Sequence, residues 1–276
     1  MPHSVAARER WSRHDGKSLK GSYDTAGDTK ISQLLRAFAV GTDIILGHVA
    51  ILVKSNEIPA MQALVRELGL AGVLCTADAM HCQIKTIAAV KASGGEALLQ
   101  VKGNQPSLEA AFEALPVRHE PEDCHVEIGK IRRNRQEKRQ IEVFKAGGLL
   151  DLPEWRADVV AAVRITRTVQ RQDVATGWKW QCTHEVAWYA ATGEGNSAAY
   201  YAAATRGHWG VENRVHYVLD VSMHEDASRV RKSPTILSIL RSFALNILRF
   251  NKVNDVADAL WRNAMNLNRA LAYGGT

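Results

Sequence analysis

The chain has 276 residues, and its 46% hydrophobic content is enough to bury the core of one large domain or two smaller ones. Basic residues outnumber acidic ones by 35 to 29 and the pI is near 9.2, which suits an anionic partner without requiring one. The four cysteines are scattered and form no CxxC pair, which excludes a zinc ribbon and a disulfide framework.

The sequence contains no segment typical of export or membrane insertion. It begins with MPHSVAARERWSRHD, which is polar and charged, unlike a signal peptide. The longest apolar stretch, ILSILRSFALNILRF, is interrupted by Arg241 and Asn246 and is too short to span a bilayer. We therefore expect a cytoplasmic protein with no membrane contact, in which this stretch forms a core helix.

The first half of the chain alternates between strand and helix patterns. Two apolar runs at 31–53 flank a Gly-Thr-Asp turn and predict a hairpin of buried strands. A helix should follow, capped by Asn56 and stopped by Gly69. Residues 71–117 then show strand, helix, strand and helix patterns, which predicts an α/β fold with a mixed sheet. Asp78 stands at the carboxyl end of the first of these strands, where open sheets place ligands.

The second half changes character. Between about 118 and 192, β-branched and aromatic residues dominate, which indicates a β-rich insertion. Its tryptophans are expected to pack on a sheet: Trp178, Trp180 and Trp188. Helical patterns follow at 197–220, 233–250 and 254–273. Ser233 is expected to cap the second of these helices, with Pro234 in its first helical position.

Three acidic residues, far apart in the chain, are the candidate catalytic groups. They are Asp15 in HDGKSLKGS, Asp78 in TADAMHCQ and Glu212 in RGHWGVENRVHYVLDV. If folding brings them together, their mutual repulsion requires one or two divalent cations. Two metal ions about 4 Å apart can activate a water or a 3′-hydroxyl and stabilise the leaving oxygen of a phosphodiester. The pattern therefore suggests a polynucleotidyl transferase.

Basic residues gather in places that could contact DNA phosphates. The densest stretch is IRRNRQEKR, for which a charged turn between two strands is an equally good interpretation. The others flank the first acidic residue and follow the last one, where an exposed turn or loop explains the same pattern. The candidate DNA contacts are Lys17, Lys20, Arg132, Arg133, Arg135, Arg139, His208, Arg229, Arg231 and Lys232.

One helical stripe supports a different class of function. His208, Glu212 and His216 stand four residues apart and share a helix face, as metal ligands of a small-molecule metallohydrolase would. The stripe lacks the HExxH arrangement of zinc proteases. For the trio taken alone, simple hydrogen bonding along a partly exposed helix is the favoured interpretation.

Several motifs in one order, DGKSLKGS, KSNEIPA, TADAMHCQ, SGGEALLQVKGNQPSL and RGHWGVENRVHYVLDVSMHEDASRVR, cover most of the chain. With them the sequence resembles the ISAs group of bacterial insertion-sequence transposases, which includes the H-repeat-associated proteins. The resemblance implies a ribonuclease H-like fold with a β-rich insertion and a DDE triad at Asp15, Asp78 and Glu212. It also implies two Mg²⁺ or Mn²⁺ ions in the active site. The expected partner is double-stranded DNA, both at the ends of the element and at the target, and the expected assembly is a homodimer in a synaptic complex.

Such a protein is expected to nick DNA at the element ends and join the freed 3′-hydroxyl to target DNA in the nucleoid. Relatives have an apolar strand before the first aspartate, whereas ERWSRH precedes it here, so we expect an amino-terminal truncation. The alternative function is therefore an inactive remnant that retains DNA binding. The expected segments are an irregular leader at 1–14, the first part of the core at 15–117, the β-rich insertion at 118–192 and a helical completion of the core at 193–276.

Overall fold

The fold was analysed in a computed structural model that describes residues 11–19, 33–39, 42–51, 56–172 and 177–274. The chain divides into two compact units, which are described separately. The first comprises residues 1–76, 92–95 and 206–276, and the second comprises residues 77–91 and 96–205. Over the described residues, no helix has both the length and the apolar character needed to cross a membrane.

The first unit contains four neighbouring strands in the order β3-β2-β1-β4. Its strands are β1 (Trp11–Ser18), β2 (Gln33–Ala39), β3 (Ile44–Ile51) and β4 (Leu74–Ala77). β1 runs antiparallel to β2 and parallel to β4, and β2 and β3 form the predicted antiparallel hairpin. The sheet is therefore mixed, as the alternation of elements predicted.

Helix α1 (Glu57–Leu68) packs against β2 and β3. The Asn56 side chain accepts a hydrogen bond from the Ile58 amide, and Gly69 ends the helix in the left-handed conformation with φ 60°. Both predicted helix signals are thus confirmed. Gly47 of β3 faces this helix, since a Cβ there would lie 3.1 Å from the side chains of Leu64 and Leu68.

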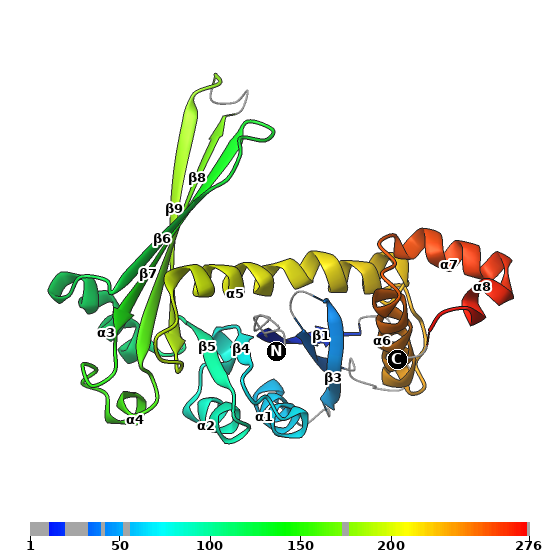
Figure 1. The fold of residues 1–276 in the computed structure, drawn as a ribbon, viewed down its shortest axis with the longest axis horizontal. Helices are drawn as coiled ribbons and strands as arrows, with labels where there is room; N and C mark the ends of the chain where they lie inside the picture. Colours follow the sequence, from blue (N-terminus) through cyan, green and yellow to red (C-terminus); the bar gives the residue numbers. More distant parts are fainter. Residues whose placement is uncertain (1–10, 20–32, 40–41, 52–55, 173–176, 275–276) are drawn as a thin grey trace, which may run out of the picture. The chain divides into compact units, whose positions relative to one another are not determined.

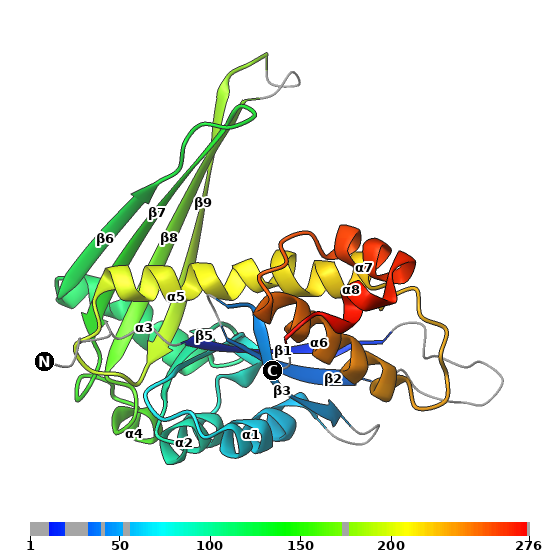
Figure 2. The ribbon, with the colours of Figure 1, turned by 45° about the vertical axis from the view of Figure 1, so that its right-hand side comes forward.

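The carboxyl-terminal elements of the first unit build its apolar core. Helix α5 (Ala198–Val211) continues into two π-helical segments, η4 (Glu212–His216) and η5 (Val218–Ser222), and α6 (Pro234–Phe250) packs against β3 (Figure 2). The Asn246 side chain bonds both main-chain groups of Ile45, which explains an amide within an apolar helix. The buried cluster consists of Phe38, Ile45, Val215, Leu219, Leu245, Leu248, Val256 and Ala259.

Two expectations for the first unit were wrong. Residues 11–14 are not irregular, because β1 begins at Trp11 and its early residues pair with both β2 and β4. Ser233 has φ 53° and makes no capping bond, although α6 does begin at Pro234. The last helix is split at Asn266 into α7 (Val256–Met265) and α8 (Leu267–Leu271).

The second unit contains an antiparallel sheet with the order β5-β9-β8-β7-β6 (Figure 1). Its strands are β5 (Glu96–Val101), β6 (Asp123–Ile128), β7 (Arg135–Lys145), β8 (Ala161–Gln172) and β9 (Trp180–Ala191). Its helices, besides the start of α5, are η2 (Ala79–His81), α2 (Ile84–Ala92), α3 (Pro106–Arg118) and α4 (Pro153–Arg156). β6 to β9 lie within the segment predicted to be β-rich. Its role as an insertion into a ribonuclease H-like core stays a prediction.

Helices cover only part of this sheet. On one face Phe112 of α3 contacts Trp188 with ring centroids 5.8 Å apart, and on the other Asp123 accepts a hydrogen bond from the Ala198 amide at the start of α5. Beyond them lies the distal half of the sheet, residues 126–140, 166–172 and 180–186. The predicted packing is confirmed for Trp188 but is wrong for Trp178 and Trp180, which are exposed.

Candidate active site

The first acidic position lies in β1, and the second directly follows the neighbouring strand β4. β1 and β4 are parallel, with Arg13 opposite Thr76. Asp15 follows Arg13 by two residues within β1, and Asp78 follows Thr76 by two residues, at the end of β4. The side chains of Asp15 and Glu212 lie outside the described part of the structure, and Asp78 belongs to the second unit.

His208 connects helix α5 to the same two strands. Its Nδ1 lies 3.1 Å from the Thr76 hydroxyl, and its main-chain carbonyl accepts a hydrogen bond of 2.5 Å from the Arg13 guanidinium. His208 is buried, and its predicted contact with DNA stays a prediction. Its contacts fix the helical turn that precedes Glu212.

The alternative metal stripe does not form among the described side chains. His216 is buried and packs edge-on against Phe38, with ring centroids 5.3 Å apart. In the part of the chain that the structure describes, no three metal-binding side chains come together. The two histidines of the stripe are therefore packed in the first unit, and a hydrolase centre built on them stays a prediction.

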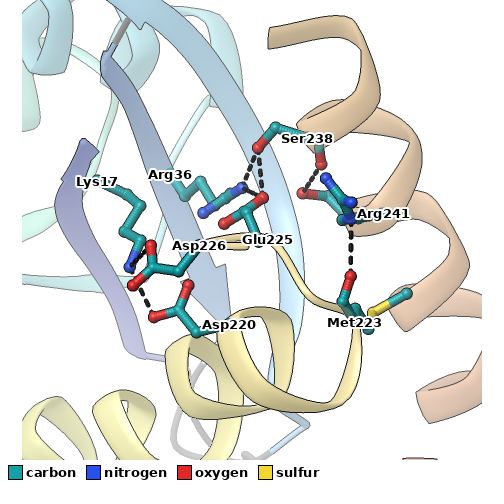
Figure 3. A network of polar contacts seen from close by, with 9 residues as sticks. Lys17, Arg36, Asp220, Met223, Glu225, Asp226, Ser238 and Arg241 are labelled. Atoms are coloured by element: carbon teal, nitrogen blue, oxygen red, sulfur yellow. Dashed lines mark hydrogen bonds and ion pairs between the residues drawn. The ribbon is translucent and has the colours of Figure 1, made fainter. Parts of the chain in front are cut away.

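Lys17 forms an ionic clamp between β1 and the segment that follows Glu212 (Figure 3). Its Nζ lies 2.6 Å from Asp220 and 3.1 Å from Asp226. Burial alone would lower the Lys17 pKa, but the hydrogen bonds to both carboxylates raise it above its ordinary value. Lys17 was predicted to contact DNA. Its ammonium group is already held by two acids, and its contact with DNA stays a prediction.

A second cation on the neighbouring strand makes a buried network (Figure 3). The Arg36 guanidinium lies 2.6 Å from Glu225 and also contacts the Ser238 hydroxyl of α6. Ser238 in turn donates to Glu225 at 2.5 Å. Arg36 is the residue opposite Asp15 in the β1–β2 ladder. The segment after Glu212 is therefore tied to both strands, to β1 through Lys17 and to β2 through Arg36.

Within the second unit, Asp78 begins an exposed turn. Its carboxylate is 54% exposed and lies 3.9 Å from the buried His81 ring. The side-chain amide of Asn104 donates a hydrogen bond to the Ala79 carbonyl at 2.6 Å, and the side-chain amide of Gln105 donates one to the Cys82 carbonyl at 2.8 Å. We did not single out these two residues from the sequence, although both lie in the motif VKGNQPSL. They hold the turn that presents Asp78.

The arginine-rich stretch is a turn between two strands, as one of its two interpretations predicted. Arg133 and Asn134 both have positive φ, as the central residues of a type I′ turn do. Arg132 and Arg133 are exposed there. Arg139, by contrast, lies 2.6 Å from Glu137, and Arg135 lies 3.4 Å from the same carboxylate. Arg132 and Arg133 of the turn stay proposed phosphate contacts, and Arg135 and Arg139 also stay so although they lie close to Glu137.

The remaining predicted DNA contacts follow η5. Arg229, Arg231 and Lys232 are exposed, which fits their predicted role without testing it. Lys20 lies outside the described residues. A separate cavity of about 670 Å³ lies in the second unit beside Asp123, Gly195 and Tyr201, and none of the predicted site residues lines it.

Comparison with known proteins assigns the chain to a family. The family described as "Transposase DDE domain" matches residues 10–247. The chain therefore belongs to the DDE transposase domain family, and the match includes all three acidic positions.

Three curated bacterial proteins are similar over most of the chain. YbfL and the "H repeat-associated putative transposase YhhI", both of Escherichia coli K12, are each 31% identical over 246 residues, which is 87% of this chain and 64% of theirs. The "Putative transposase YncI" of Escherichia coli O157:H7 is 33% identical over 243 residues, 85% of this chain and 60% of that protein. The chain thus matches less than two thirds of the length of each of these relatives.

Proposed function

We propose that this chain is the catalytic part of an insertion-sequence transposase, which cleaves DNA strands and joins the resulting 3′ ends to target DNA. Asp15, Asp78 and Glu212 form its catalytic triad. The observation that carries the proposal is the pairing of Arg13 with Thr76 in parallel strands. Each aspartate follows a member of this pair by two residues along its chain segment, which supports the inclusion of both in one site.

The contacts of His208 support the inclusion of Glu212. Its ring and carbonyl contact Thr76 and Arg13, the paired residues that precede the two aspartates. One helical turn separates His208 from Glu212, and this short distance along the chain supports the inclusion of the third acid. Lys17 and Arg36 hold the segment beyond Glu212 to β1 and β2.

The donor set fits a hard divalent cation. Three carboxylates offer only oxygen ligands, which Mg²⁺ and Mn²⁺ prefer. When bound, two such ions would activate the attacking oxygen and stabilise the leaving oxygen. The residues of the chain supply the remaining functions. Asn104 and Gln105 hold the turn that carries Asp78, and Arg229, Arg231 and Lys232 offset phosphate charge.

The test is strand cleavage by the purified chain with double-stranded DNA that carries the element ends and Mg²⁺. We expect nicking that needs the metal ion and disappears in Glu212→Gln and Asp78→Asn. The matched control is Glu67→Gln, an exposed carboxylate on α1, which should nick as the wild type does.

Nicking that survives in Glu212→Gln would refute the triad. No nicking by the wild-type chain, together with DNA binding that weakens steeply with salt, would support the alternative of an inactive DNA-binding remnant. Binding of DNA that is insensitive to salt would contradict both DNA functions.

A further inference from the structure

Lys102 is an exposed cation at the carboxyl end of a buried strand. It directly follows β5, whose last residue, Val101, is 1% exposed. Lys17 and Lys91 each have a carboxylate oxygen 2.6 Å from the ammonium nitrogen. The side chain of Lys102, by contrast, forms no hydrogen bond or ion pair with any residue that the structure describes. Its ammonium group is therefore available to an anion from outside the chain.

The turn that begins at Lys102 is tied to the turn that begins at Asp78, and both lie in the second unit. The main-chain amide of Gln105 donates to the Lys102 carbonyl at 2.8 Å, which closes the first turn. The side-chain hydrogen bonds of Asn104 and Gln105 described above join it to the second turn. Strand β5 also packs against η2, the short helix that follows Asp78. Lys102 and Asp78 therefore belong to one braced piece of the chain.

The two opposite charges on this braced piece do not neutralise each other. Asp78 is 54% exposed, and its described ionic neighbour is His81 at 3.9 Å. No ion pair joins Asp78 to Lys102, although the two turns are hydrogen-bonded to each other. Many exposed lysines are simply hydrated, and it is this link to Asp78 that distinguishes Lys102. The carboxylate is left for a metal cation, and the ammonium group for an anion.

We propose that Lys102 binds a phosphate of the DNA strand beside the position at which that strand is cut. The inference rests on the proposed function, in which Asp78 is a metal ligand, and it adds a contact with the substrate. An ammonium group has three donors on a flexible stem, so it can reach a phosphate oxygen without strict geometry. Because Lys102 is braced against the turn of Asp78, a phosphate held by it is placed relative to the catalytic carboxylate.

The first test measures DNA binding by the purified full chain over a range of salt concentrations. Lys102→Gln should weaken binding and lower the slope of log affinity against log salt by about one. The change should be the same for element ends and for unrelated DNA, because a phosphate contact carries no sequence information. Lys102→Arg should keep the wild-type slope, since it keeps the charge. The matched control is Lys145→Gln, an exposed lysine at the end of β7, which should bind as the wild type does.

The second test locates the contact. In element-end DNA, one phosphate at a time is replaced by an uncharged methylphosphonate, and binding is measured for wild type and Lys102→Gln. Wild type should lose affinity at one phosphate next to the end of the element, and Lys102→Gln should show no further loss there, because the two changes remove the same contact. With unmodified DNA and Mg²⁺, Lys102→Gln should also nick roughly tenfold more slowly or worse at saturating DNA, and Lys102→Arg should recover most of the rate.

The outcomes separate this inference from the proposed function. A Lys102→Gln that keeps the wild-type salt slope and nicks as the wild type does overturns the inference and leaves the triad standing. A contact that maps away from the end of the element overturns it as well. A wild-type chain that binds DNA but does not nick refutes the catalytic function, while the binding comparisons still decide whether Lys102 holds a phosphate. A chain that binds no DNA overturns both.

Discussion

The two units each contain an arginine–glutamate pair, in very different surroundings. In the first unit Arg36 and Glu225 have side chains that are 0% and 1% exposed. In the distal sheet of the second unit Arg167 and Glu137 are 32% and 27% exposed. The N–O distances, 2.6 Å and 3.0 Å, are both short enough for an ion pair. We therefore expect burial, more than contact distance, to determine what each pair contributes to folding.

Burial removes both charged groups from water, and hydrogen bonds within the described protein replace only part of that hydration. Arg36 Nε and Nη1 and Glu225 Oε2 have no hydrogen-bond partner among the described residues. Such a pair contributes little net stability, yet removal of one partner leaves a buried charge alone. The exposed pair keeps part of its hydration, so its loss should cost much less.

The largest expected effect is that of Arg36→Met. It leaves the Glu225 carboxylate buried without its cation and should lower the free energy of unfolding by about 3–5 kcal/mol. The measurement is urea denaturation at neutral pH. In the double variant Arg36→Met/Glu225→Leu no charge remains, so most of the lost stability should return. A double variant as unstable as the sum of its single variants would contradict this account of the pair.

Lys17→Met should have an intermediate effect. It leaves Asp220 and Asp226 together at a partly exposed site, and loss of hydrogen bonds to charged groups costs about 1.5–3 kcal/mol. Urea denaturation measures this change. The conservative Lys17→Arg should recover part of the lost stability, since it keeps the charge. The double variant Lys17→Met/Asp220→Asn removes the repulsion between the two acids. If it recovers as much free energy of unfolding as Lys17→Arg does, that repulsion is the main cost of losing Lys17.

The smallest mutational effect is expected for Arg167→Met in the distal sheet. Glu137 keeps Arg139 as a partner, so the free energy of unfolding should fall by about 1 kcal/mol or less. The control is Arg262→Met, which removes an exposed pair with Asp258 within α7. If Arg167→Met lowers the free energy of unfolding as much as Arg36→Met does, the difference in exposure does not determine what the two pairs contribute to stability.

The sequence predicted the elements that depend on local signals. The cap at Asn56, the stop at Gly69 and the hairpin at 31–53 follow from residue preferences over a few positions, and the structure confirms them. The strand at Trp11 was missed because its pattern is polar. Arg13 and His14 are buried through partners distant in the chain, which no local pattern reveals.

The candidate site was only partly predictable for the same reason. Asp78 was expected at the end of a strand, and η2 does begin there. The sequence shows charges but not their partners, so Lys17 and Arg139 looked available for DNA although carboxylates hold both. His208 likewise looked like an exposed ligand, because its contacts with Arg13 and Thr76 depend on the tertiary fold.

Thermal unfolding over a series of pH values tests what the exposed pair of Arg167 and Glu137 contributes to stability. Burial opposes the charge of Glu137, but Arg167 and Arg139 lower its pKa to about 2, below its ordinary value of 4.5. A carboxylate with a depressed pKa contributes stability that is fully present above its unfolded pKa and is lost as pH falls toward the folded one. The difference in melting temperature between wild type and Glu137→Gln should therefore be constant above about pH 5.5 and shrink between about pH 4.5 and pH 2. A difference that grows on acidification would mean that Glu137 is stabilised in its protonated form, and the distal half of the sheet would then not be held by its ion pairs with Arg139 and Arg167.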